Sequence, residues 1–272
     1  MKARCRNIVV ISDTHFGSSI GLCPPSAMLD DDITVAPSLM QQTMWKLWLD
    51  FWQWAHITIG REPFILVHNG DMIDGNHHQT TQLMTGNLTD QKKIAVAAML
   101  PHTELAAAYY QIRGTEAHVG KSAQTEELVA DELGAVALAP NMGRHSHWEL
   151  FMEFGNDLIH FAHHIGSTTS TAYESSAVMR EMANAFVEAG QFNQRVPTIL
   201  VRSHRHRYIK VQVPHCTGVV TPAWQGKTAF THRIDRIRSP QFGGLLIRHT
   251  GHGRAYILER IYEAARPAHV IV

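Results

Sequence analysis

Aspartate and histidine residues stand at short, fixed spacings in this sequence, and both residue types bind transition metals. The apolar stretch at 8–11 runs into Asp13 and His15, two such residues separated by one position. The 272 residues include 19 histidines, several of them in clusters. Because neutral imidazole is the commonest transition-metal ligand, this abundance favours a metal site. One pair alone would more often form a turn at the end of a strand.

Four more apolar stretches end on residues of the same kind. They run into Asp71, into the segment 114–118, into His163 and His164, and into His204 and His206. In an open α/β sheet, ligands bind beyond the carboxyl ends of the strands, so five such ends can meet in one crevice. The pattern therefore predicts a site for two metal ions. Nitrogen and carboxylate ligands suit manganese, zinc or iron, whereas calcium prefers oxygen ligands alone.

Hydrophobic periodicity predicts the elements that must carry these residues. Helices are expected at 39–56, 91–100, 121–134 and 174–190, and a strand precedes each ligand group. The tryptophans of the first helix recur at helical spacing, which is typical of core packing. Strands alternate with helices at first and dominate later. This order predicts one α/β domain over residues 1–272, with a largely antiparallel second sheet that the C-terminal strands at about 207–262 complete.

The composition is that of a globular protein and excludes several classes of function. Hydrophobic residues make up 44% of the chain and charged residues 18%, which excludes a disordered chain. Basic and acidic residues balance at 24 each, so no overall field attracts nucleic acid or a membrane. No run is apolar enough to span a membrane, and we expect no secretory leader. Three scattered cysteines indicate reduced thiols and a cytoplasmic protein.

Four short motifs, in order along the chain, resemble those of the calcineurin-like metallophosphoesterases. They are D-x-H at Asp13 and His15, G-D-x-x-D from Gly70 to Asp74, a later His163, and H-x-H at His204 and His206. The resemblance covers residues 8 to about 206. It implies a four-layer α/β/β/α sandwich, which is an α/β fold with mixed sheets flanked by helices. It also implies a centre of two divalent transition-metal ions.

The same resemblance implies a role for each ligand. By position, Asp71 would bridge the two ions. The remaining ligands would be divided between the first ion, with Asp13, His15 and His206, and the second ion, with His163 and His204.

Two neighbours of these ligands have alternative roles. Adjacent residues on a strand point to opposite faces, so only one of His163 and His164 can bind metal, and the family pattern favours His163. Asp74 would orient a neighbouring histidine or, alternatively, form a turn before Gly75.

One motif departs from the family pattern. The family carries Gly-Asn-His after its third strand, where Asn binds the second ion and His assists the leaving group. A literal Gly-Asn-His at 75–77 begins only four residues after Asp71, too close to follow another strand, and we interpret it as a polar loop. The segment 114–118 is the better match. The sixth ligand is then Glu116, Thr115 or a water, and His118 takes the histidine role, unless 114–118 is only a turn.

The chemistry that follows is hydrolysis of a phosphate ester. A hydroxide between the two ions would attack phosphorus in line, and His118 would stabilise the departing oxygen, with Asp74 in support. The sequence contains no covalent-nucleophile motif and no Walker-type phosphate loop. The favoured function is a phosphodiesterase or nuclease-like enzyme. The alternatives are a phosphomonoesterase of the protein-phosphatase kind and a non-catalytic scaffold on the same fold.

Two features beside the H-x-H motif concern the substrate. A basic cluster comprises Arg202, Arg205, Arg207 and Lys210, followed by arginines at 233, 236 and 238. Arg205 could hold the backbone of a diester, which makes a nucleic acid or nucleotide a candidate partner. Trp224 could stack on a base over the cleft or anchor the core. The zero net charge argues against a broad nucleic-acid interface.

Overall fold

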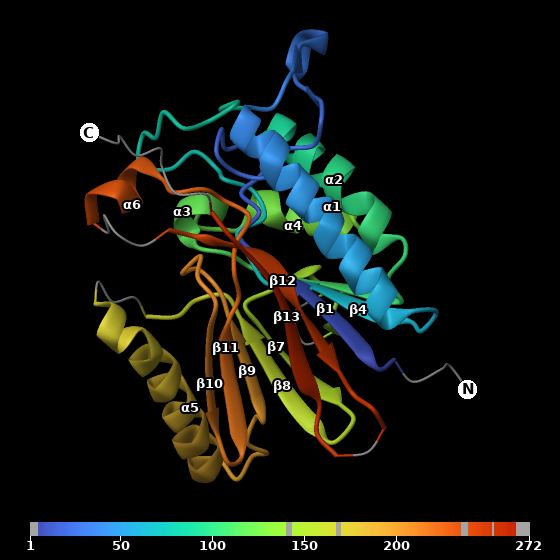
Figure 1. Cartoon of the computed structure of the whole chain (residues 1–272), viewed down its shortest axis with the longest axis vertical. Helices are drawn as coiled ribbons and strands as arrows, with labels where there is room; N and C mark the ends of the chain where they lie inside the picture. The colour runs from blue at the N-terminus through green and yellow to red at the C-terminus, as the bar shows by residue number, and fades with distance from the viewer. Residues whose placement is uncertain (1–4, 140–142, 167–169, 235–238, 252, 265–272) are drawn as a thin grey trace, which may run out of the picture.

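A computed structural model describes residues 5–139, 143–166, 170–234, 239–251 and 253–264 of the chain (Figure 1). It contains two large sheets with helices on their outer faces. Within these ranges, no helix combines the length and apolar character that crossing a membrane requires.

The first sheet has six strands in the order β13-β12-β1-β4-β5-β6. Their bounds are β1 (Asn7–Ile11), β4 (Phe64–His68), β5 (Ala108–Ile112), β6 (Ser146–His147), β12 (Gln241–Arg248) and β13 (Tyr256–Glu263). Strands β1, β4, β5 and β6 pair in parallel, so their carboxyl ends meet at one edge. The antiparallel pair β12-β13 extends the sheet beyond β1.

The second sheet has five strands in the order β10-β11-β9-β8-β7. Their bounds are β7 (Glu149–Phe154), β8 (Asp157–Ala162), β9 (Ile199–Arg202), β10 (Ile209–Val213) and β11 (Cys216–Val220). The expectation of a largely antiparallel sheet is wrong, because the central strands β8, β9 and β11 pair in parallel. Helix α5 (Glu174–Gln191) connects β8 to β9, and a helical crossover of this kind joins parallel strands.

The C-terminal strands are divided between the two sheets, which corrects the expectation that they complete the second. Only β10 and β11 belong to the second sheet, whereas β12 pairs antiparallel with β1 in the first. The reason is burial on both faces of β12. Leu245 packs between the two sheets, and Leu246 packs beneath the helices. A strand that is apolar on both faces fits the interior of a sheet.

The layers follow from three apolar clusters. One lies between the sheets and includes Val10, Phe161 and Val201. A second joins the first sheet to its covering helices, and a third joins the second sheet to α5. The covering helices are α1 (Leu39–Ile59), α2 (Leu88–Thr103) and α4 (Gln124–Glu132). Figure 1 shows α1 and α2 over one sheet and α5 along the other. The predicted α/β fold of mixed sheets flanked by helices is confirmed.

The expected helices are present with shifted ends. Helix α1 begins after a capping box in which Ser38 and Gln41 exchange hydrogen bonds, and it ends at Gly60, whose φ is 68°. As its spacing predicts, α1 buries Trp48 and Trp52. The sequence analysis missed several short elements: β2 (Ala27–Met28), β3 (Thr34–Val35), α3 (Glu116–Val119) and α6 (Ala229–Ile234). Two-residue strands and single helical turns carry little periodic signal.

Candidate metal centre

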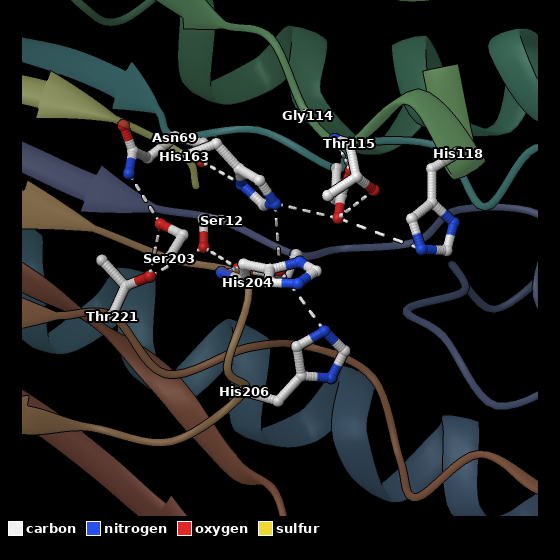
Figure 2. A network of polar contacts seen from close by, with 12 residues as sticks. Ser12, Asn69, Gly114, Thr115, His118, His163, Ser203, His204, His206 and Thr221 are labelled. Carbon is white, nitrogen blue, oxygen red and sulfur yellow. Dashed lines mark hydrogen bonds and ion pairs between the residues drawn. The ribbon is translucent and has the colours of Figure 1, made fainter. Parts of the chain in front are cut away.

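The predicted ligands lie in the loops that leave the carboxyl ends of β1, β4, β8 and β9, and Figure 2 shows several of them converging. Backbone hydrogen bonds tie the first two loops together. The amide of Asp13 donates to the carbonyl of Gly70 over 2.9 Å, and that of His15 donates to Asp71 over 3.2 Å. The two loops therefore hold their ligands in a fixed relation.

Unusual backbone conformation marks these loops. The left-handed region is occupied by Asp13, His15, Asp71, His204 and His206, with φ between 45° and 72°. Non-glycine residues adopt this conformation rarely and at a cost in free energy, and such residues cluster at functional sites. Five predicted ligands share it, so the strand ends turn sharply enough to point several side chains into one space.

The first group of ligands is Asp13, His15 and His206. Nε2 of His206 lies 3.3 Å from Oδ1 of Asp13 and 3.2 Å from Nε2 of His15. Nδ1 of His15 is 3.1 Å from Oδ1 of Asp74, and a carboxylate only accepts, so Nδ1 carries the proton. In the neutral ring, Nε2 of His15 then presents its lone pair to the group, as a metal ligand requires.

The second group is Asp71, His163 and His204. Nδ1 of His163 donates to the carbonyl of Asn69 over 2.7 Å, which fixes the tautomer and aims Nε2 at Oδ2 of Asp71, 2.9 Å away. A Cβ atom at Gly70 would lie 2.8 Å or less from the His163 side chain, so the close approach requires glycine there. His164 instead stacks on His204, with ring centroids 4.8 Å apart.

The donor atoms fit a pair of cations. Oδ1 of Asp13 and Nε2 of His163 are buried, and each lies beside another predicted ligand atom, with Nε2 of His206 3.3 Å from the first and Oδ2 of Asp71 2.9 Å from the second. Buried charged groups need compensation, and a cation between carboxylate oxygens and imidazole nitrogens gives both kinds of atom a partner. Mixed nitrogen and oxygen donors suit zinc, manganese or iron.

The charges of the centre are strongly coupled. Burial lowers the pKa of His163, but the carboxylates of Asp71 and Asp13 outweigh it and raise the pKa to about 10. Burial raises the pKa of Asp13 and of Asp71, yet the nearby histidines hold both pKa values below the usual range. Both carboxylates are therefore ionised at neutral pH. A cation bound to His163 would replace its proton, so metal affinity depends on pH.

The segment 114–118 contacts Asp71 through Thr115, not through Glu116. The amide of Thr115 donates to Oδ1 of Asp71 over 2.7 Å, and its hydroxyl lies 3.1 Å and 3.2 Å from the two carboxylate oxygens. Glu116 is exposed and belongs to none of the ligand groups found among the described residues. This corrects the expectation that Glu116 binds metal. Glu116 is the first residue of α3 and lines the pocket beside His118.

His118 lies beside the centre. Its Nδ1 donates to the carbonyl of Asp74 over 2.6 Å, and its Nε2 is 4.0 Å from Oδ2 of Asp71. Burial lowers the pKa of His118 to about 4. Its donor atoms group with those of His15 and Asp71. In the neutral form the proton stays on Nδ1 and Nε2 faces Asp71 with its lone pair, which can bind a metal ion, whereas donation to a leaving group requires the protonated ring.

Two residues near Asp74 were not expected at the centre: Gln225 was not singled out, and His77 was assigned to a polar loop. Oδ1 of Asp74 accepts from Nε2 of Gln225 over 2.9 Å, so Gln225 helps to hold the carboxylate that orients His15. The ring of His77 lies 4.4 Å from that of His118, and its Nε2 is 3.6 Å from Oδ2 of Asp74. The loop interpreted as unrelated to the ligands therefore touches the centre. The three-residue spacing from Asp74 to His77 was the available signal.

Trp224 cannot stack on a base. Its side chain is fully buried against Trp48 and Phe51, with ring centroids 5.0 Å and 6.0 Å apart. This corrects its assignment to substrate binding. The residue still serves the centre, since its amide donates to the carbonyl of Asp13 over 2.8 Å.

Acidic groups of α5 neutralise much of the basic cluster. Arg202 is buried and lies 3.2 Å from Oε2 of Glu181, and Arg207 lies 3.2 Å from Oε1 of Glu174. Arg205 is half-buried and donates to the carbonyl of Glu174 over 2.9 Å. Arg236 and Arg238 lie outside the described residues. The cluster therefore anchors α5 to the H-x-H loop, while Arg205 and Arg207 are half-buried and Lys210 is exposed.

A polar network supports the centre from behind (Figure 2). Ser12 contacts the carboxylate of Asp13 and lies 2.8 Å from the hydroxyl of Thr221. Thr221 contacts Ser203 over 2.8 Å, and Asn69 donates to Ser203 over 2.6 Å. These side chains connect the loops after β1, β4, β9 and β11, so they hold both groups of ligands together.

A pocket of about 410 Å³ opens beside His118. Its walls come from α3, the start of α4 and the loop between them, with Asn76 and Leu88 opposite. Lys121, Ser122 and Gln124 contribute polar groups. The pocket is large enough for a small organic group and shares His118 with the metal centre.

No family model matches this chain, and no curated protein matches it in sequence. Several solved structures are distantly similar. Vps29 from Chaetomium thermophilum is 11% identical, with 98% of this chain and 100% of that chain covered and a TM-score of 0.44. An archaeal phosphodiesterase is 10% identical, with 93% and 99% covered and a TM-score of 0.44. A predicted phosphoesterase from Streptococcus pneumoniae is 12% identical, with 94% and 99% covered and a TM-score of 0.36. Similarity at this level does not identify an activity.

Proposed function

We propose that this protein is a metal-dependent hydrolase of phosphate esters that uses two divalent transition-metal ions. The observation that carries the proposal is the convergence of two Asp/His groups, in which the buried atoms Asp13 Oδ1 and His163 Nε2 face other predicted ligand atoms. Carboxylate and imidazole donors without a cation would be costly to bury. The chemistry that two such ions supply is activation of a phosphoryl group and of water.

The residues would divide the work by their positions. Asp13, His15 and His206 would hold one ion, and His163 and His204 the other, with Asp71 between them. Asp74 would keep His15 in the ligand tautomer, because its carboxylate accepts the Nδ1 proton. His118 faces the centre from the side of the pocket, where a leaving group would depart.

The pocket favours a diester over a monoester. A monoester needs room for one organic group, whereas a diester needs a second contact region near the ions. The pocket beside His118 would hold one organic group, and Arg205 on the H-x-H loop would contact the other. Organic diesters, including nucleotides, fit this arrangement. A phosphoprotein monoester, which would use the pocket and not Arg205, is the alternative.

Hydrolysis assays on metal-stripped protein test the proposal. We expect activity on a nitrophenyl phosphodiester to return when Mn²⁺, Zn²⁺ or Fe²⁺ is added, with a lower rate on nitrophenyl phosphate. Asp71→Asn should abolish turnover of both esters and leave the circular dichroism spectrum unchanged. Full activity of Asp71→Asn would refute the mechanism. Tight binding of two ions without hydrolysis of any ester would instead favour the non-catalytic scaffold.

A further inference from the structure

We propose that Glu126 on α4 is a positioning residue for the metal centre, and that it fixes both the loop after β4 and the loop after β5. The inference rests on the proposed function, because it assigns to Glu126 the support of the bridging Asp71. Sequence patterns did not single out this glutamate. Its side chain is fully buried behind the centre.

Three neutral donors surround the Glu126 carboxylate. The amide of Gly114 donates to Oε2 over 2.7 Å, and the Gln111 side chain donates to Oε1 over 2.8 Å. The amide of Met72, which directly follows Asp71, lies 3.4 Å from Oε1. Among the described residues, no ion pair involves Glu126. A buried carboxylate without a cation destabilises a fold unless its hydrogen bonds compensate, so a role beyond packing is indicated.

The hydrogen bonds form a short path to Asp71. Successive amides of one loop donate in two directions, with Gly114 donating to Glu126 and Thr115 donating to Oδ1 of Asp71. The loop is held between the two carboxylates. Met72 connects Glu126 to the same aspartate through the chain. A movement of Glu126 would therefore displace Asp71 both through the loop and along its own backbone.

Gln111 extends the same support. It contacts Tyr109, and its Nε2 lies 3.4 Å from Nδ1 of His68. Nε2 of His68 in turn is 3.0 Å from the hydroxyl of Thr14, which stands between Asp13 and His15. The network around Glu126 thus reaches the loops of both ligand groups. Groups hydrogen-bonded behind metal ligands set ligand orientation and commonly change metal affinity 10–100-fold when removed.

Calorimetric titration of Mn²⁺ into metal-stripped protein tests the role of Glu126. Glu126→Gln keeps the shape of the side chain but replaces one carboxylate oxygen with an NH₂ group. This group cannot accept the hydrogen bond that the oxygen received from its neighbours. We expect its dissociation constant for at least one ion to rise about 10–100-fold. The rate constant kcat on a nitrophenyl diester should fall more than KM rises. The control is Glu132→Gln, which removes an exposed carboxylate from the same helix and should bind Mn²⁺ like the parent.

Folded Glu126→Gln protein with parental Mn²⁺ affinity would overturn the inference, even if its melting temperature were lower. If Glu126→Gln does not fold, Gln111→Met removes one of the three donors to Glu126, together with the contacts of Gln111 to Tyr109 and His68, and should still weaken Mn²⁺ binding. Unchanged binding in that variant would also overturn the inference. A parent protein that binds no Mn²⁺, Zn²⁺ or Fe²⁺ would refute the proposed function itself, which keeps the two failures distinct.

Discussion

Replacing Gly114 with alanine should disrupt the metal centre through steric contact alone. Gly114 is buried where the loop after β5 passes Asp71. A Cβ atom at this position would lie 2.8 Å from Cα of Asp71 and closer to its amide nitrogen and Oδ1. The backbone of Gly114 is not in the left-handed region, so alanine is excluded by space and not by its φ angle.

The expected magnitude follows from that contact. Carbon atoms approach comfortably to about 3.5–4.0 Å, so Asp71 or the loop must move by about 1 Å. Metal–ligand distances tolerate only about 0.2 Å, and a 1 Å displacement of reacting groups can cost about 100-fold in rate. We therefore expect Gly114→Ala to lose at least one of the two ions and about 100-fold or more in kcat.

Metal content by mass spectrometry and kcat on a nitrophenyl diester measure these effects, and circular dichroism verifies the fold. The matched control is Gly190→Ala on the outer face of α5, where a Cβ atom meets nothing within 4 Å. Alanine in a helix should stabilise the control by up to about 1 kcal/mol without changing metal content. A folded Gly114→Ala variant with both ions and the parental kcat would refute the placement of Gly114 against Asp71.

Three further predictions follow from the geometry. His118→Ala should slow the hydrolysis of esters with poor leaving groups more than that of nitrophenyl esters, and its metal content should stay unchanged. Equal losses of rate for all esters, together with a loss of metal, would make His118 a ligand. His102, stacked on Trp52 and partly buried, has its pKa lowered by burial to about 3. On acidification, His102 therefore gains its proton at a higher pH in the unfolded chain than in the folded protein, so the free energy of unfolding falls as the pH drops below about 6.5. His102→Phe should reduce the dependence of this free energy on pH by up to about 1.4 kcal/mol per pH unit in urea titrations. An unchanged dependence would contradict the prediction. Trp224→Ala should lower the free energy of unfolding by about 3–5 kcal/mol in the same assay, because its ring is fully buried; a loss below about 1 kcal/mol would contradict that packing.

The predicted ligands that the structure brings together share one property: each lies in a loop that leaves an apolar strand. Asp13, Asp71 and His204 could be predicted because a strand has a local signal, and parallel strands bring their carboxyl ends together. The same reasoning placed Glu116 at the centre from its residue type alone. It failed because a single helical turn begins at that position, and one turn leaves no periodic signal.

Contacts between distant elements could not be predicted. Gln225 reaches Asp74 from a loop 151 positions later in the chain, and no local pattern marks that contact. The pairing of β12 with β1 could not be predicted either, because an apolar strand fits the interior of both sheets and its sequence does not distinguish them. Glu126 lies in the first turn of α4, where an acidic residue usually faces solvent and favours the helix N-terminus. Its burial depends on the loop after β5.

Thr115 changes the set of donors that the proposed centre would offer. It stands where the resemblance implies an amide ligand, and its hydroxyl contacts both oxygens of Asp71. Besides Asp71, the first group offers Asp13, His15 and His206, whereas the second offers His163 and His204. The second ion would therefore have fewer protein donors than the first. Since affinity follows the number and kind of donors, two ions bound to this centre would differ in affinity, and the weaker one would depend most on how firmly Asp71 is held.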